Sequence, residues 1–320
     1  MSFRKRVLTH IGTFPQSVPA NISFDHEQRF KDYTGHIISY DLEENERVRA
    51  VLLTPEVVSG KMPAILAIHQ HNGEYHLGKA ETSGWDINGK IKELNPMYAY
   101  GRDLVQRGYV VICPDLLCFE ERRDPHFGKS NDSGSSYEIF EFTKRVQTGS
   151  SLLAKYLHDM TVALDVLCSL DYVDTARLGV IGHSLGGQTS LYTTWYDKRI
   201  KVGASSCGFG MISTIIRNKI NHNKSMYIPG FSTFADTNDI LCDIAPRAFT
   251  FTSGVTDSLF PIDGVREIAA KAERKFAGQG MSDKLLTHIF DGGHCFDDEA
   301  KKKVYAFIDK QLGWMGAPAT

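Results

Sequence analysis

A serine set among glycines is the residue of this sequence best placed to do chemistry. The stretch "LGVIGHSLGG" runs from Leu178 to Gly187 and contains Gly-His-Ser-Leu-Gly, with Ser184 at its centre. The apolar run before Ser184 is typical of a buried strand, and "LGGQTSLYTTWY" after it is typical of a helix. On such a sharp turn a serine projects its hydroxyl outward, while the glycines let strand and helix approach closely. We therefore predict that Ser184 is a nucleophile rather than a polar turn residue.

A serine hydroxyl is a poor nucleophile at neutral pH and needs a base that is oriented by a carboxylate. In enzymes that use this turn, the order along the chain is serine, then Asp or Glu, then His. Asp257 follows the strand-like run "RAFTFTSG", and His294 lies in "DGGHCF" after "LLTHIF". We predict that His294 is the base and Asp257 its carboxylate, with Asp263 and Asp243 open as alternatives to Asp257. His183 is expected to point away from Ser184 and to pack.

Acyl transfer also needs hydrogen-bond donors for the oxygen that becomes negative in the transition state. The backbone N–H of Leu185, at the helix start after Ser184, is one expected donor. A second is expected from the loop that follows an early buried strand, in "AIHQHNGEYHLGK". The histidines of this loop, His69, His71 and His76, also resemble a metal-ligand cluster. No carboxylate or thiolate at ligand spacing accompanies them, so we predict no metal.

Composition places the chain among ordinary globular proteins and excludes some partners. It has 320 residues, 42% hydrophobic and 23% charged, with a formal net charge of -2. This balance disfavours a nucleic-acid partner, which usually requires a strongly basic face. We see no secretory signal and no apolar run long enough to span a membrane, so we expect a cytoplasmic protein. The six cysteines are scattered without a Cys-x-x-Cys pair, which favours reduced, packed thiols over a disulfide framework.

Strand and helix patterns alternate from about residue 62 to the end of the chain, which predicts an α/β fold with a mostly parallel sheet covered by helices on both faces. Before them, "HIISYDL" and "RVRAVLLTP" flank a charged turn and predict an antiparallel strand pair. We expect one domain over residues 1–320, with an irregular N-terminal arm at 1–30. Residues 116–150 and 208–245 break the alternation and are expected to be irregular insertions near the active site.

With these residues in hand, the chain resembles the α/β-hydrolase superfamily, and within it the dienelactone hydrolase and acetyl xylan esterase branch. The resemblance covers about residues 30–312. The segments that carry it are "PAILAIHQHNG", "RGYVVICPDLLCFEERR", "LHDMTVALDVL", "VDTARLGVIGHSLGG", "YIPGFSTFADTNDILCDIAPRAF", "GVTDSLFP" and "GGHCF". It implies a triad of Ser184, Asp257 and His294, hydrolysis of carboxylic esters through an acyl-enzyme, and no cofactor. In many relatives the early loop begins His-Gly-x, and x donates its N–H to the oxyanion. Gln70 replaces that glycine here, so His71 is the donor by position.

Two rival functions stay open at this point. A serine peptidase of the prolyl-oligopeptidase type shares the triad and its order, although such enzymes carry a large extra domain. A hydrolase-fold protein that only binds a ligand would keep the pocket without the chemistry.

The predicted partner is a small-molecule ester of a small acyl group. A homo-oligomer stays an open alternative, in which the N-terminal arm packs on a neighbouring subunit. We expect the pocket wall to mix aromatic and polar side chains. Its expected substrate-binding residues are His69, Gln70, Phe119 and Tyr227.

Overall fold

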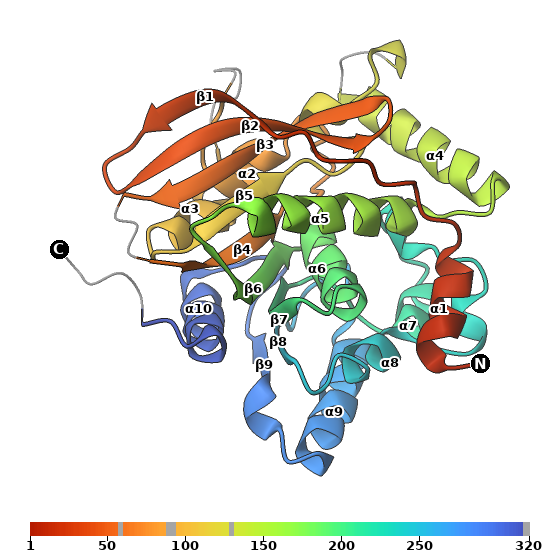
Figure 1. The fold of residues 1–320 in the computed structure, drawn as a ribbon. Helices are drawn as coiled ribbons and strands as arrows, with labels where there is room; N and C mark the ends of the chain where they lie inside the picture. The colour runs from red at the N-terminus through yellow and green to blue at the C-terminus, as the bar shows by residue number, and fades with distance from the viewer. Residues whose placement is uncertain (57–59, 88–93, 128–130, 316–320) are drawn as a thin grey trace.

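The computed structural model describes residues 1–56, 60–87, 94–127 and 131–315. Within these ranges a nine-stranded sheet runs through the molecule in the order β1-β2-β3-β5-β4-β6-β7-β8-β9 (Figure 1). The first three strands and the β3–β5 pair are antiparallel, and every later pair is parallel. The strands are β1 (Ser23–Arg29), β2 (Tyr33–Glu43), β3 (Glu46–Pro55), β4 (Met62–Ile68), β5 (Val110–Pro114), β6 (Val173–His183), β7 (Ile200–Ser206), β8 (Ala248–Gly254) and β9 (Leu285–Phe290).

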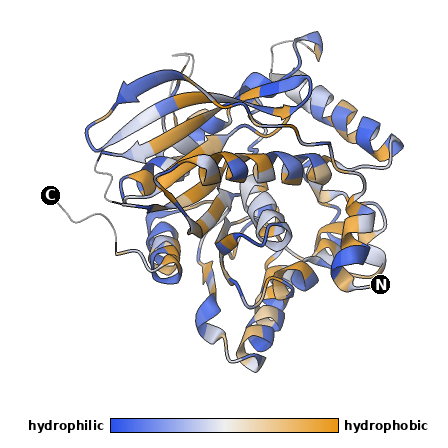
Figure 2. Ribbon diagram, in the orientation of Figure 1, coloured by the Kyte–Doolittle hydropathy of each residue, from blue (hydrophilic) through white to orange (hydrophobic). Residues whose placement is uncertain are grey.

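Helices cover both faces of this sheet, because the central strands are apolar on both sides. One core packs α5 and its neighbours on the sheet, and a second packs α3 and α10 on the opposite face. Figure 2 shows the apolar colouring concentrated in the central strands and in the inner sides of these helices. The α-helices are α1 (Phe3–Ile11), α2 (Lys79–Ser83), α3 (Tyr100–Val105), α4 (Asn131–Gln147), α5 (Leu152–Ser169), α6 (Leu185–Tyr196), α7 (Ile212–Arg217), α8 (Thr237–Cys242), α9 (Ile262–Gly278) and α10 (Asp298–Leu312). The short 3-10 helices are η1 (Pro96–Tyr98), η2 (Glu120–Arg122), η3 (Pro125–Phe127), η4 (Lys224–Met226), η5 (Phe231–Thr233) and η6 (Ser282–Lys284).

The architecture confirms the predicted α/β fold, its antiparallel N-terminal strands and its flanking helices. None of the helices in the described ranges is long and apolar enough to cross a bilayer. All six cysteines are free thiols, as predicted.

The N-terminal arm is not irregular, which corrects the prediction for residues 1–30. It forms α1 and the edge strand β1, whose sequence "SFDHEQR" lacks apolar alternation because almost the whole strand is exposed. The arm packs on its own chain: the Arg4 guanidinium lies over the Trp195 ring and donates to the carbonyls of Trp195 and Tyr196 at 2.7 and 2.6 Å.

The two insertions are also more regular than predicted. The segment at 116–150 forms η2, η3 and the 17-residue helix α4, while its residues 128–130 lie outside the described ranges. The polar, Gly/Ser-rich start of α4 hid its helical pattern, since its stability comes from packing on the domain rather than from propensity. The segment at 208–245 contains α7 and α8 joined by two short 3-10 helices.

A buried ion cluster fixes the segment after β5 against α2. The Lys79 side chain is fully buried, and its Nζ lies 2.6 Å from Asp115, 2.8 Å from Glu120 and 2.8 Å from Glu121. Arg122 donates to the Asp115 carbonyl at 2.9 Å, so the turn that follows the strand closes on itself. Removing one member of such a cluster leaves buried charge without compensation.

Replacing Lys79 by methionine is therefore expected to lower the free energy of unfolding by about 3–5 kcal/mol, because Asp115 and Glu120 lose their buried cation. Urea denaturation measures the effect. Lys303→Met is the control, since Lys303 pairs with Glu299 on the exposed face of α10 and its loss should change stability little. Equal effects of the two substitutions would contradict this account.

Candidate active site

The backbone of the turn that carries Ser184 is tightly constrained. Ser184 lies between β6 and α6 at φ 53° and ψ −118°, a region that side-chain-bearing residues rarely adopt. Its N–H donates to the Ser206 carbonyl on β7 at 2.8 Å. A Cβ added to Gly186 would lie 2.0 Å from the Ile68 carbonyl oxygen, and one added to Gly182 would lie 2.2 Å from the Gly186 backbone. Both flanking glycines are therefore required by close backbone contact.

The structure joins the residues predicted as nucleophile, base and orienting carboxylate in one chain of hydrogen bonds. Ser184, Asp257 and His294 follow β6, β8 and β9, so they meet at the carboxyl edge of the parallel sheet. His294 Nε2 lies 2.8 Å from Ser184 Oγ, and His294 Nδ1 lies 2.8 Å from Asp257 Oδ2. This geometry matches a nucleophile, a base and an orienting carboxylate.

Backbone hydrogen bonds fix the Asp257 carboxylate through the oxygen that does not contact His294. Its side chain is fully buried, and Oδ1 accepts hydrogen bonds from the backbone N–H groups of Leu259 and Phe260 at 2.8 and 3.3 Å. The two alternative carboxylates are engaged elsewhere, because Asp243 accepts from Trp195 Nε1 at 2.7 Å and Asp263 pairs with Arg217.

His183 is buried and packs against the His294 ring, which agrees with its predicted role as a packing residue. Its ring centroid lies 4.9 Å from that of His294 and 5.0 Å from that of Tyr98. Nδ1 lies 3.0 Å from Ser206 Oγ. Burial, reinforced by the neighbouring His294, lowers the pKa of His183 well below its usual range. His183 therefore stays uncharged beside the His294 ring.

The loop after β4 is built on His69, which is fully buried. Leu116 N–H donates to His69 Nε2 at 3.0 Å, so Nδ1 carries the proton and donates to the Gln70 carbonyl at 2.7 Å. Burial lowers the pKa of His69 to about 4, and the ring is neutral. Both ring nitrogens are thus occupied by backbone. This arrangement supports neither the predicted substrate contact of His69 nor the alternative in which His69 binds a metal.

The other three predicted substrate-binding residues lie in different surroundings. Phe119 is fully buried and stacks on Tyr75 with 5.0 Å between ring centroids, so its predicted substrate contact is not supported either. Gln70 is nearly buried and donates through Nε2 to Glu81. Tyr227 is 36% exposed and lines an apolar pocket of about 300 Å³ between α4 and α7.

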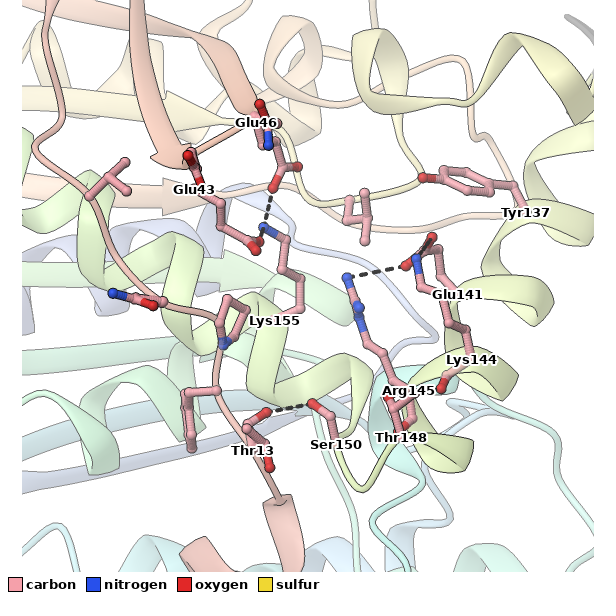
Figure 3. Close-up of a pocket in the computed structure, with 17 residues that line it drawn as sticks. Thr13, Glu43, Glu46, Tyr137, Glu141, Lys144, Arg145, Thr148, Ser150 and Lys155 are labelled. Atoms are coloured by element: carbon pink, nitrogen blue, oxygen red, sulfur yellow. Dashed lines mark hydrogen bonds and ion pairs between the residues drawn. The ribbon is translucent and has the colours of Figure 1, made fainter.

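A large pocket lies away from Ser184, Asp257 and His294. It has a volume of about 1070 Å³ and is walled by the N-terminal arm, the β2–β3 turn, α4 and α5 (Figure 3). Charged side chains that are paired with one another dominate it, as Lys155 with Glu43 and Arg145 with Glu141 show. Ser184, Asp257 and His294 are not among its lining residues.

One group of side chains could place three metal ligands together in the described ranges. The donor atoms of Cys207, Asp257 and His294 lie within 4.8 Å of one another. Asp257 and His294 already use these atoms on each other, and burial raises the pKa of the Cys207 thiol to about 12. Because metals bind the thiolate, this group favours the hydrogen-bonded arrangement over metal binding.

Several residues of the site carry no sequence signal. His222, from the 208–245 insertion, packs against Phe260 with the rings tilted and their centroids 4.7 Å apart, and Phe260 in turn stacks on His294 at 6.0 Å. Glu138 of α4 approaches His71 of the loop after β4 to 3.6 Å. Both predicted insertions therefore reach the site, but only the folded structure shows which of their residues do so.

Strain at Ser184 predicts an unusual stability effect. Glycine adopts φ 53° without cost. The free energy of unfolding of Ser184→Gly should therefore be higher than that of Ser184→Ala by about 1 kcal/mol. At Ser190, a buried position inside the same helix, the order should be reversed because glycine weakens helix interiors. Chemical denaturation of the four variants measures both differences, and the same order at both positions would refute strain at Ser184.

The buried carboxyl group of Glu81 predicts how the stability of the protein depends on pH. Burial, and then the charges of Glu74 and Glu120, raise the pKa of the Glu81 carboxyl to about 8. Since the unfolded chain releases this proton at a lower pH, Glu81 costs stability progressively as the pH rises from about 5 to 8. Glu81→Gln should therefore stabilise the protein at pH 8 by about 1 kcal/mol or more, and the gain should shrink toward pH 5. Urea denaturation at both pH values tests this, and a gain independent of pH would contradict it.

Comparison with known proteins identifies the family and the fold. Residues 48–303 match the model of the dienelactone hydrolase family. The chain is 28% identical over 311 residues to "Putative hydrolase YtaP" of Bacillus subtilis, which spans 97% of this chain and 98% of that protein. Two solved structures share the fold. The glucuronoyl esterase from Solibacter usitatus has a TM-score of 0.70 and 17% identity, with coverage of 96% of this chain and 92% of that chain. The acetyl xylan esterase 1 from a Thermoanaerobacterium species has a TM-score of 0.62 and 16% identity, with coverage of 97% and 99%. The chain therefore belongs to the dienelactone hydrolase family and has the α/β-hydrolase fold.

Proposed function

We propose that this member of the family is a serine esterase that cleaves esters of small acyl groups through an acyl-enzyme. The observation that carries the proposal is the position of His294, whose two ring nitrogens each lie 2.8 Å from a partner, Ser184 Oγ and Asp257 Oδ2. A serine in this contact can lose its proton at the moment of attack.

In the first half of the proposed reaction, Ser184 Oγ bonds to the ester carbonyl carbon while His294 Nε2 takes the hydroxyl proton. The carbonyl oxygen becomes an oxyanion, held by the backbone N–H groups of Leu185 and His71. Asp257 accepts from Nδ1–H and stabilises the imidazolium. The bond to the leaving alcohol then breaks, and His294 gives its proton to the departing oxygen. The acyl group remains on Ser184.

In the second half, water takes the place of the alcohol. His294 removes a proton from water as the water oxygen attacks the acyl carbon. The bond to Ser184 Oγ breaks, the proton returns to Ser184, and the carboxylic acid leaves. Neutral His183 beneath the His294 ring avoids the repulsion that a charged neighbour would add to this imidazolium.

The surroundings of the nucleophile favour a polar alcohol group. Gln188 lies one helical turn after Ser184, accepts from Asn223 Nδ2 at 3.0 Å and donates to Ser225 Oγ at 3.4 Å. Polar side chains from the 208–245 insertion thus pack against the first turns of the helix that follows the serine, where a lipase would present a broad apolar surface. We propose a sugar acetate or a lactone as the substrate class.

Replacing Ser184 by alanine should lower the turnover of p-nitrophenyl acetate by at least about 10³-fold, because it removes the nucleophile. Ser190→Ala is the control, since Ser190 is a buried serine of the same helix with no place in the hydrogen-bonded chain. A fluorophosphonate probe should label the wild type and not Ser184→Ala. Unchanged turnover in Ser184→Ala would refute the assignment.

A substrate panel separates the proposal from its rivals. Acetyl esters should be cleaved much faster than octanoyl esters and faster than matched amides. A preference for amides would favour a peptidase, and a preference for long acyl chains would refute the small-acyl proposal. An unlabelled wild type without turnover would favour a protein that only binds its ligand.

A further inference from the structure

Glu138 is a buried carboxylate that connects three segments around the site. It lies on α4, and only 3% of its surface is exposed. Its Oε2 accepts from the Tyr75 hydroxyl at 2.8 Å and lies 3.6 Å from His71 Nε2. Its Oε1 accepts from the backbone N–H of Lys224 at 3.1 Å. One side chain thus links the loop after β4, the helical insertion and the second insertion.

The His71 ring is held in a defined orientation toward this carboxylate. Gly73 N–H donates to His71 Nδ1 at 2.9 Å, so the ring proton lies on Nε2, the nitrogen that faces Glu138. The ring also packs edge-on against Tyr75 and Phe119, with centroids 4.8 and 5.1 Å away. Because Glu138 contacts both His71 and Tyr75, it acts at two points of the same short loop.

Charge strengthens this contact. Burial raises the pKa of the Glu138 carboxyl, but its contact with His71 and its hydrogen bonds outweigh that effect and lower the pKa overall. Glu138 is therefore ionised at neutral pH, and a carboxylate accepts stronger hydrogen bonds than a neutral group does. Its negative charge attracts the Nε2–H of His71 in surroundings from which water is largely excluded.

The close packing of α4 on Tyr75 fixes the position of the Glu138 carboxylate. A Cβ added to Gly134, one turn before Glu138, would lie 2.2 Å from Tyr75 Cβ and Cγ. The helix therefore approaches the loop as closely as glycine allows, and it cannot shift toward Tyr75 without a clash.

We propose that Glu138 is a positioning residue for the oxyanion: by holding the His71 ring and the Tyr75 hydroxyl, it sets the backbone N–H of His71 where the developing negative oxygen needs a donor. This inference rests on the proposed esterase function. It predicts that loss of the carboxylate weakens binding of the transition state more than binding of the ester.

The test compares Glu138→Gln with Glu141→Gln. Glu141 lies one turn further along α4, is equally buried, and pairs with Lys144 and Arg145 rather than with the loop. For p-nitrophenyl acetate, Glu138→Gln should lower kcat about 10- to 100-fold while KM changes less than about 3-fold. This loss is smaller than the loss of about 10²–10³-fold for removal of an oxyanion donor, because the His71 N–H is kept and only its position changes. Glu141→Gln should keep kcat, whatever it does to thermal stability.

A trifluoromethyl ketone provides the readout that a purely structural role would not move. This inhibitor forms a tetrahedral oxyanion on Ser184, so its affinity should fall in Glu138→Gln by the same factor as kcat/KM. His71→Ala keeps the backbone N–H and should show a similar loss, and the double variant should be no worse than the single ones, because both substitutions remove one interaction. The His71→Ala measurement also tests the proposal if Glu138→Gln folds poorly.

Three outcomes would overturn the proposal: an unchanged kcat in Glu138→Gln, equal losses of kcat in Glu138→Gln and Glu141→Gln, or an inhibitor affinity that does not follow kcat/KM. A wild type that neither hydrolyses esters nor reacts with the probe would instead refute the proposed esterase function, so the two failures are distinguishable.

Discussion

The contact between Gly186 and the end of β4 is the constraint on which the site depends. The backbone at Gly186 lies so close to the Ile68 carbonyl that no side chain fits between them. Ile68 is the last residue of β4, and the loop that begins with His69 follows directly. The start of α6, which carries Ser184 and the Leu185 N–H, is therefore fixed against the loop that carries His71. Tyr100 strengthens the junction by donating its hydroxyl to the same carbonyl.

Fixing this junction matters for the proposed acyl transfer, because such a reaction needs groups from separate strands to be positioned within a few tenths of an ångström. The parallel sheet brings Ser184, Asp257 and His294 to one edge, and local hydrogen bonds then orient each of them. Ser184 is held through its N–H by β7, and Asp257 by two backbone donors in its own turn. The precision comes from backbone contacts within the scaffold, while the insertions add side chains around them.

The sequence was sufficient to predict the fold and the three residues that the structure joins by hydrogen bonds. Strand and helix periods are local signals, and the order of Ser184, Asp257 and His294 follows from a motif whose parts occur at successive strand ends. The other features depend on long-range packing, which the sequence pattern does not reveal. The polar edge strand β1 has no apolar alternation, and the start of α4 is rich in glycine and serine, so neither shows a period. The burial of His69 and Phe119 depends on Leu116 and Tyr75 from other segments, which no local pattern reveals.

Helix α4 contacts the loop after β4 through a residue that its sequence pattern does not single out. Two acids one turn apart on this helix, Glu138 and Glu141, face different surroundings: the first meets His71 and Tyr75, and the second meets Lys144 and Arg145. A buried carboxylate that pairs within its own helix stabilises that helix alone. A buried carboxylate that pairs with a distant loop makes the position of that loop depend on the helix. In the role proposed for Glu138, an insertion tunes the chemistry without supplying any group that touches the reacting atoms, because the proposed donor, the His71 N–H, belongs to the scaffold.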